Sequence, residues 1–307
     1  MKNSQIENSV EKLTDTENNP VRVFSMSEDR STGQELAFKT WTFPGGEIGV
    51  KFDGEFSRVG RSFVVSVYGK YNPAVWDQVS QIVSIVRSTD PYASVALIVP
   101  YLPYARQDRA CNKGEDFALD TFVRTRIAPL DLTTLVVWDV HSDVAKNCIH
   151  KHTSAETYFI DQDLFYQEMF EMYDFVVYPD DGAAKKLELN FKLPFGTKPV
   201  VMEKTRTSDG VKYKKYTGEH LFGKILVIDD ICDGGATFVS LAEKILESSD
   251  DITQLDLSVT HGIFSKGMLP LHSAGYDNVF AVNNISDIPN VISPAQHVIN
   301  VKSVKTS

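Results

Sequence analysis

The sequence of 307 residues has no long apolar segment. A membrane-spanning helix needs about 20 consecutive apolar residues, and no run approaches that length. The first twenty residues, MKNSQIENSVEKLTDTENNP, are polar and lack the apolar core of a signal peptide. We therefore expect no membrane partner, a loose segment at residues 1–20 and a cytoplasmic protein.

Basic residues are fewer than acidic ones, with 31 Lys and Arg against 41 Asp and Glu and a formal net charge of −10. Broad binding to nucleic acid or to an anionic membrane requires an excess of Lys and Arg that neutralises phosphates. The composition therefore argues against both functions. It leaves room for a small phosphorylated ligand, which needs only a few local cations.

Cysteine is also scarce. Cys111, Cys148 and Cys232 are scattered, odd in number and without an evident metal-ligand spacing. This pattern predicts free thiols in a reducing cytoplasm, in place of a disulfide framework.

Short β-branched runs alternate with amphipathic stretches along the rest of the chain. Strands are expected at 21–26, 62–68, 95–99, 135–138, 175–178, 200–202, 225–228, 255–259 and 279–282, and helices from Pro73 and at 182–189 and 238–246. Such alternation predicts mainly parallel sheets flanked by helices, the α/β class. The pattern runs twice, so we expect two tandem domains, at 21–150 and 151–286, and a tail at 287–307.

The segment ILVIDDICDGGATF, residues 225–238, carries the most informative pattern. Four apolar residues lead into Asp229 and Asp230, and small residues then precede a helix. Small residues let backbone N–H groups approach an anion, and the helix N-terminus adds its dipole. Paired carboxylates suit sugar hydroxyls or Mg²⁺. The pattern predicts a ribose phosphate site, the alternative being an ordinary strand–turn–helix connection with acidic caps.

These residues resemble the phosphoribosyl pyrophosphate loop of type I phosphoribosyltransferases, and further segments resemble ribose-phosphate pyrophosphokinases. The further segments are VPYLPYARQDR (99–109), DVH (139–141), YPDDG (178–182), KTR (204–206) and THGIFS (260–265). They occur in the family's order over about residues 41–285. The resemblance implies two tandem type I phosphoribosyltransferase-like domains. It also implies transfer of the β,γ-diphosphoryl group of ATP to the anomeric hydroxyl of ribose 5-phosphate, which gives phosphoribosyl pyrophosphate and AMP.

The resemblance assigns a role to each matching residue. ATP binding falls to Phe43, Glu47, Arg106, Gln107 and Arg109, and Mg²⁺ binding to His141 and Asp180. Catalytic stabilisation of the diphosphate falls to Lys204 and Arg206, and ribose phosphate binding to Asp229, Asp230, Asp233, Gly234, Gly235, Ala236 and Thr237. A homo-oligomer, either a dimer or a hexamer, is also implied, as is a tail that returns to the first domain.

Some of these residues have a structural alternative. His141 could be a packed imidazole, and the stretch 207–215 could be a plain basic hairpin in place of a mobile lid over the site.

The sequence departs from the family pattern at three places. Gly45 stands where the adenine-binding hairpin has Asp, and Gly234 stands where the phosphate loop has Thr. Segment 110–117 has fewer basic residues than the family's usual basic, proline-containing segment. F-P-G-G-E together with C-N-x-G-E resembles a divergent bacteriophage branch associated with NAD rebuilding, some members of which act on ADP-ribose. ADP-ribose is thus an alternative substrate, in a host cytoplasm. A phosphoribosyltransferase and an inactive regulatory subunit are the less favoured alternatives.

Overall fold

The chain folds as two compact units, residues 1–160 and 161–307. The computed structural model describes residues 20–26, 33–53, 62–161, 169–188, 193–194, 196–207, 210–214, 218–286, 288–289 and 291, without the side chains of 186–188, 205–207 and 210–212. The loose segment predicted for residues 1–20 lies outside this part of the chain, apart from Pro20. Within the described ranges, no helix has the length and apolar character needed to cross a membrane.

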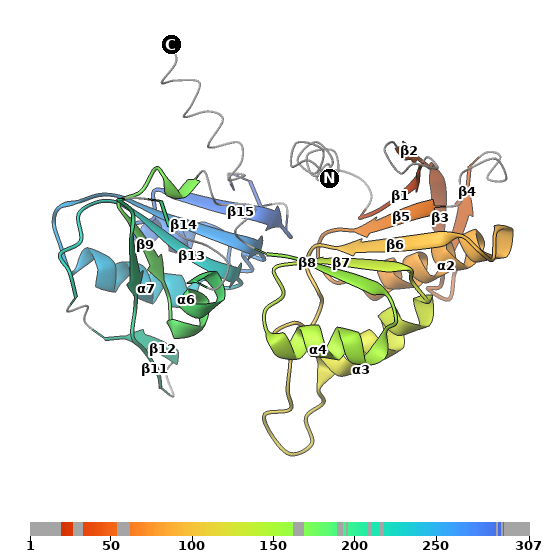
Figure 1. Ribbon diagram of the computed structural model, residues 1–307, viewed down its shortest axis with the longest axis horizontal. Helices are drawn as coiled ribbons and strands as arrows, with labels where there is room; N and C mark the ends of the chain where they lie inside the picture. The colour runs from red at the N-terminus through yellow and green to blue at the C-terminus, as the bar shows by residue number, and fades with distance from the viewer. Residues whose placement is uncertain are drawn as a thin grey trace, which may run out of the picture. The chain divides into compact units, whose positions relative to one another are not determined.

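The first unit is built on a six-stranded sheet (Figure 1). Its strands, in spatial order, are β2 (Gly33–Glu35), β1 (Val21–Met26), β5 (Ser62–Val67), β6 (Ser94–Val99), β7 (Thr134–Trp138) and β8 (Glu156–Ile160). The four strands β5 to β8 pair in parallel, and β1 runs antiparallel to β2 and β5. The four strands predicted in this half of the sequence are confirmed.

Helices α2 (Pro73–Thr89), α3 (Ala118–Phe122) and α4 (Asp143–His152) belong to the same unit. The helix predicted from Pro73 is confirmed, and its start has a clear cause. The Asn72 side chain accepts a hydrogen bond from the N–H of Ala74 at 3.0 Å, and proline suits the first helical position. The face that carries Val79 and Ile82 is fully buried. A π-turn, η2 (Val123–Ile127), and a 3₁₀ turn, η3 (Ala128–Leu130), extend α3.

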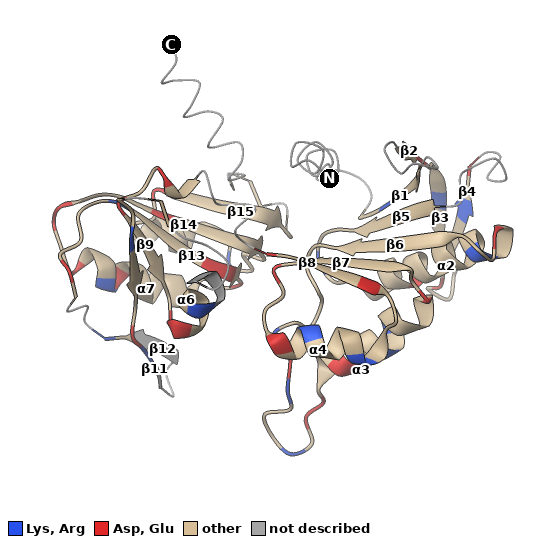
Figure 2. Cartoon of the chain, viewed as in Figure 1, with Lys and Arg blue, Asp and Glu red and all other residues tan. Residues whose placement is uncertain are grey.

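The second unit is built on a five-stranded, fully parallel sheet. Its strands, in spatial order, are β10 (Lys198–Val201), β9 (Phe175–Tyr178), β13 (Gly223–Cys232), β14 (Ile252–Gly262) and β15 (Asn278–Asn284), and its helices are α6 (Asp181–Glu188), α7 (Ala236–Leu246) and α8 (Leu269–Ser273). The predicted fold class, α/β with mainly parallel sheets flanked by helices, is confirmed. Acidic and basic residues are mixed along the helices of both units (Figure 2).

Two hairpins stand apart from the sheets, β3 (Phe38–Thr42) with β4 (Ile48–Phe52), and β11 (Lys204–Thr207) with β12 (Gly210–Tyr213). The sequence pattern predicts a boundary between the two domains at residue 150. The structure divides the chain after Ile160, because β8 pairs with β7 and so continues the first sheet. Near the C-terminus, Ile288 and Val291 pack against the core of the second unit. The rest of the tail lies outside the described residues, so its return to the first domain stays a prediction.

The centre of the first sheet should dominate the stability of its unit. Leu97 in β6 is fully buried between neighbouring strands. We expect Leu97→Ala to lower the free energy of unfolding by about 2–5 kcal/mol, because it leaves a cavity. Tryptophan fluorescence during a urea titration measures this, since all three tryptophans lie in the first unit. The control is Leu269→Ala at an exposed position of α8, which should leave that transition unchanged.

Candidate functional site at the strand ends

The register of two neighbouring strands brings the acidic residues of the second unit to one edge. Strand β9 pairs in parallel with β13, with Val177 opposite Val227. Continued by three residues, this register places Asp180, just after β9, beside Asp229 and Asp230 in β13. The sequence analysis placed these carboxylates at strand ends; their proximity comes from the register.

Asp180 holds two partners. Its Oδ1 accepts a hydrogen bond from the N–H of Ala183 at 2.9 Å, which satisfies a free donor at the start of α6. Its Oδ2 forms an ion pair with Nζ of Lys204, the first residue of the β11–β12 hairpin. Burial acts to raise the pKa of Asp180, but the hydrogen bonds from Lys204 and Ala183 outweigh it and the pKa is lowered. The strand end thus holds an ionised carboxylate against a cation.

Asp229 and Asp230 are adjacent and electrostatically strained. The N–H of Asp230 donates to Oδ1 of Asp229 at 2.8 Å. Burial raises the pKa of Asp229, and the negative charges of Asp230 and Asp180 raise it further. A ligand that donates hydroxyl hydrogen bonds, or a divalent cation, would relieve this cost. Carboxylate oxygens are the donors that Mg²⁺ prefers, so the residues present fit such an ion.

The loop after β13 reaches the start of α7 through two glycines, Gly234 and Gly235. Gly235 adopts φ 77° directly before α7, a conformation that favours glycine, and a Cβ there would lie 3.2 Å from Leu271. Oγ of Ser265 donates to Oδ1 of Asp233 at 2.7 Å, which joins the THGIFS segment to the loop. A Cβ on Gly234 would lie 3.5 Å from Cε of Lys266, so the stem of this lysine runs beside the loop. Lys266 adds a cation that the sequence analysis did not single out.

Tyr213 is a second residue that the sequence analysis missed. It lies opposite Lys204 in the β11–β12 hairpin, and β12 packs against α7. Tyr213 is only 5% exposed, yet its hydroxyl has no hydrogen-bond partner among the described residues. Burial raises its pKa, as do the charges of Asp229 and Asp180, so the hydroxyl lies in the field of both carboxylates. The only signal in the sequence is an aromatic residue within VKYKK.

In the first unit, Asp108 ties the ARQDR segment to the strand end that carries His141. Asp108 is 5% exposed and accepts from Nε of Arg109 at 2.8 Å and from Oγ of Ser142 at 2.7 Å. The hydrogen bond from Arg109 lowers the pKa of Asp108 against the opposing effect of burial, and Ser142 and His141 lower it further. The structure therefore brings Arg109 and the exposed His141 to the same loop cluster.

The shape of the ARQDR loop explains which of its side chains face solvent. Tyr104 has a left-handed φ of 64°, and its ring packs against Tyr71 and Phe122 with centroids 5.1 and 5.5 Å away. This anchor leaves Arg106 and Gln107 exposed. Aromatic packing on one side of the loop thus presents polar side chains on the other.

The predicted adenine hairpin forms the β3–β4 turn. The N–H of Phe43 donates to the carbonyl of Glu47 at 2.8 Å. The Phe43 ring is 47% exposed and lies edge-on to Trp41, with centroids 5.8 Å apart. A Cβ on Gly45 would lie 2.5 Å from Oε2 of Glu47. Glycine at this position therefore allows the Glu47 carboxylate to fold over the turn.

The predicted site residues fall into two groups. The five ATP residues and His141 belong to the first unit, while Asp180, Lys204, Arg206 and residues 229–237 belong to the second. Because His141 and Asp180 belong to different units, their pairing around one Mg²⁺ stays a prediction. The backbone of Arg206 lies in β11, and its side chain is outside the described part. A hairpin, the alternative predicted for 207–215, is formed by Gly210–Tyr213 paired with Lys204–Thr207; its role stays a prediction.

Two α/β units, the second with carboxylates and a glycine loop at its strand ends, define the class of fold. No protein-family model matches the sequence. The structure is similar to the crystal structure of phosphoribosylpyrophosphate synthetase from Mycobacterium smegmatis, with a TM-score of 0.67, 19% identity and coverage of 88% of this chain and 91% of that chain. That likeness establishes the fold.

The sequence is similar over most of its length to proteins named ribose-phosphate pyrophosphokinase. The Thermoplasma volcanium protein is 24% identical over 269 residues, which cover 84% of this chain and 87% of that protein. The Thermotoga maritima protein is 23% identical over 279 residues, 87% of each chain. The Thermoplasma acidophilum protein is 27% identical over 230 residues, 72% of this chain and 74% of that protein.

The unpartnered hydroxyl of Tyr213 leads to a prediction about stability. A buried polar group without a partner costs free energy, so its removal should not destabilise the unliganded protein. We expect Tyr213→Phe to leave the Tm unchanged or to raise it, measured by calorimetry without ligand. Tyr276→Phe is the matched control, because the Tyr276 hydroxyl donates to the carbonyl of Phe238 at 3.0 Å. It should cost about 1 kcal/mol. An equal loss of Tm in both variants would contradict the assignment.

Proposed function

We propose that the chain is an ATP-dependent diphosphokinase that acts on ribose 5-phosphate and gives phosphoribosyl pyrophosphate and AMP. The observation that carries the proposal is the strand-end group of the second unit. Paired carboxylates, a glycine loop before α7 and a lysine held on Asp180 lie together there. The similarity to ribose-phosphate pyrophosphokinases over most of the chain supports the same activity.

The loop at 233–237 would bind the 5-phosphate. Its backbone N–H groups and the N-terminus of α7 favour an anion, and Lys266 beside Gly234 adds positive charge. Asp229 and Asp230 would accept hydrogen bonds from the ribose diol. Their mutual repulsion makes hydroxyl donors especially favourable at this position. The sugar would thus be held at both ends, with its anomeric hydroxyl positioned for attack.

Lys204 would act on the transferring diphosphate. The anomeric oxygen would form a bond to the β-phosphorus as the bond from that phosphorus to the α,β-bridging oxygen breaks. AMP leaves with the bridging oxygen, and the hydroxyl proton passes to solvent. Such a step needs positioning and charge neutralisation. Without ligand, the Lys204 ammonium rests on Asp180. A diphosphate carries more negative charge and would draw it away, together with Arg206 of the same hairpin.

Asp180 and His141 are the residues that would hold Mg²⁺. The bound ion would neutralise phosphate charge in the transition state. The fit of Asp180 rests on an observation: its carboxylate already holds a cation, the Lys204 ammonium, in a partly exposed position. Once Lys204 moves to the diphosphate, the Asp180 carboxylate would be available to hold the ion.

The first unit would bind ATP. The Nε of Arg109 is engaged by Asp108, which orients the guanidinium while the side chain stays 70% exposed. Arg106 and Gln107 are exposed on the same loop. Guanidinium groups bind phosphates and stack on purines. The exposed Phe43 ring is suited to adenine and Glu47 to its amino group, and we propose a homo-oligomer in which this hairpin completes a neighbouring subunit's site.

ADP-ribose is the competing substrate within the same reaction. One observation favours it: Gly234 lacks the hydroxyl that the related loop places against a 5-phosphate. The neighbouring atoms would not prevent a side chain there, because they lie 3.5 Å or more from a Cβ. A diphosphate substrate could recover the lost contact elsewhere. The relatives, however, are named for ribose phosphate, which makes ribose 5-phosphate the first choice.

An assay with ATP and Mg²⁺ tests the proposal, with each sugar offered separately and AMP release measured. We expect AMP and phosphoribosyl pyrophosphate with ribose 5-phosphate. AMP release only with ADP-ribose would show that ADP-ribose is the substrate and would still support diphosphoryl transfer from ATP. Consumption of phosphoribosyl pyrophosphate together with a base would indicate a phosphoribosyltransferase, and no reaction with either sugar would leave a regulatory subunit.

Lys204→Ala should lower kcat far more than it raises KM, because its charge matters most as the diphosphate transfers. The loss of one such donor costs about 2.7–4 kcal/mol in the barrier, or roughly 10²–10³ in kcat. Lys214→Ala is the matched control. Lys214 follows the same hairpin but pairs with exposed Glu203, so its removal should leave kcat unchanged. A large rise in KM at constant kcat would show that Lys204 only binds substrate.

A further inference from the structure

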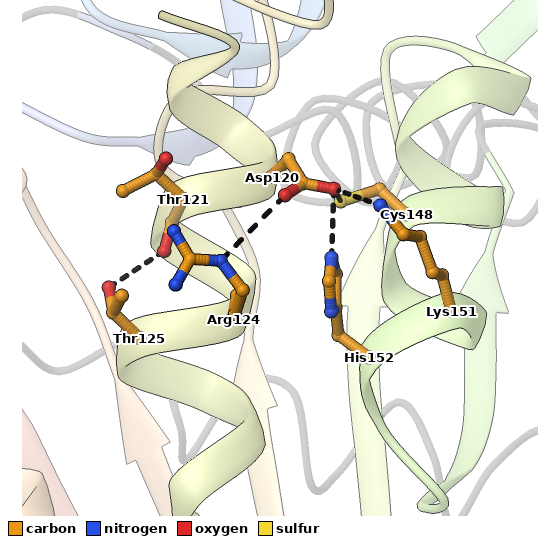
Figure 3. A network of polar contacts seen from close by, with 7 residues as sticks. All are labelled: Asp120, Thr121, Arg124, Thr125, Cys148, Lys151 and His152. Carbon is orange, nitrogen blue, oxygen red and sulfur yellow. Dashed lines mark hydrogen bonds and ion pairs between the residues drawn. The ribbon is translucent and has the colours of Figure 1, made fainter.

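A second cluster of polar side chains lies in the first unit, between α3 and α4 (Figure 3). Asp120 comes from α3, and Cys148 and His152 come from α4, four residues apart and so on one helix face. Nε2 of His152 lies 2.8 Å from Oδ1 of Asp120, and Sγ of Cys148 lies 4.0 Å from the same oxygen. The three potential ligand atoms all lie within 4.8 Å of one another.

We propose that Asp120, Cys148 and His152 form a binding site for a transition metal ion of the Zn²⁺ type, separate from the strand-end residues. Thiolate, imidazole and carboxylate are the ligands that Zn²⁺ takes, and a water molecule would complete a tetrahedron. Zinc–ligand bonds of about 2.0–2.3 Å place tetrahedral ligand atoms roughly 3.3–3.8 Å apart. The sulfur–oxygen separation is close to that range, and the nitrogen–oxygen hydrogen bond needs to open by roughly half an ångström.

The surroundings of Asp120 attract cations. Nζ of Lys151 lies 2.8 Å from Oδ1, and Nε of Arg124 lies 4.0 Å from Oδ2. The hydrogen bonds from Lys151 and His152 lower the pKa of Asp120 to about 2, so the carboxylate is ionised at any physiological pH. A metal ion would replace Lys151, whose side chain is 65% exposed and can turn into water. Exposed ion pairs of this kind contribute little to stability, so replacing the Lys151–Asp120 pair with a metal ion costs little free energy.

Cys148 distinguishes this cluster from a surface ion-pair network. It is 4% exposed, so its sulfur lies behind the two more accessible ligands. Burial and the charge of Asp120 raise the pKa of its thiol to about 11. On binding, the sulfur–metal bond forms as the thiol proton leaves to solvent. The proton that Nε2 of His152 shares with Asp120 leaves to solvent or moves to Nδ1, so that the Nε2 lone pair can bind the metal. The alternative is that the cluster only links the two helices through hydrogen bonds.

A Co²⁺ titration of the chelator-treated, full-length protein tests the proposal. A thiolate ligand gives a sulfur-to-cobalt charge-transfer band, and tetrahedral Co²⁺ gives intense visible bands. We expect both bands to saturate at one ion per chain and to disappear when Zn²⁺ is added. Cys148→Ser should abolish the charge-transfer band, and His152→Ala should weaken binding by at least about ten-fold. The controls Cys111→Ser and His150→Ala remove a thiol elsewhere and an imidazole on the same helix, and should bind as the wild type does.

Lys151→Ala keeps the test decisive if a ligand variant fails to fold. It leaves all three ligands and removes their competitor, so metal affinity should rise by several-fold. Circular dichroism checks the folding of each variant. No charge-transfer band in the wild type, a band that Cys111→Ser removes, or weaker binding in Lys151→Ala would overturn the proposal and leave a hydrogen-bonded link between helices. None of these readouts depends on diphosphokinase activity.

Discussion

The parallel pairing of β9 with β13 is the constraint on which the proposed chemistry depends. Parallel strands end at the same edge of a sheet, so this register carries Asp180 to the level of Asp229 and Asp230. Three carboxylates close together are unfavourable without a counter-charge. Lys204 supplies it from the β11–β12 hairpin, which has no pairing with the sheet among the described residues. Tyr213 packs the β12 end of the hairpin into the core, whereas Lys204 is held at the strand ends by charge, so a more highly charged ligand can compete for Lys204.

The same balance explains why the second unit is suited to ribose phosphates. Burial and repulsion disfavour the ionised form of Asp229, and hydroxyl donors or a divalent cation restore it. The adjoining loop has the opposite preference, because Gly235, the start of α7 and Lys266 favour an anion. A ligand with hydroxyls at one end and phosphate at the other satisfies both. Tyr213, buried beside this group with an unpartnered hydroxyl, is placed to contribute one more contact.

In the first unit, single carboxylates organise local structure in two different ways. Asp108 is buried and joins Arg109 to the residue after His141, so its hydrogen bonds fix the loop proposed for ATP. Asp120 is more exposed and collects Lys151, His152 and Cys148 from one face of α4. The Asp108 carboxylate uses its oxygens to accept hydrogen bonds from neighbouring side chains. The Asp120 cluster keeps a replaceable lysine, and for that reason we assign it to a metal ion.

The sequence by itself determined the fold class and most strands, because hydrophobic periodicity and β-branched runs act locally. It also located the segment 225–238 and the ARQDR segment, because their carboxylates, glycines and arginines indicate a ligand chemistry without knowledge of the tertiary structure. Only the tertiary structure decided the rest. The strand β8 (ETYFI) was missed because the expected domain boundary fell just before it and because none of its residues is fully buried. Tyr213 gains significance only opposite Lys204. Cys148 and His152 are spaced four residues apart, a pairing that a comparison of the cysteines alone does not reveal, and Asp120 is distant along the chain. The packing of α3 against α4 brings these residues together, and no local pattern encodes that contact.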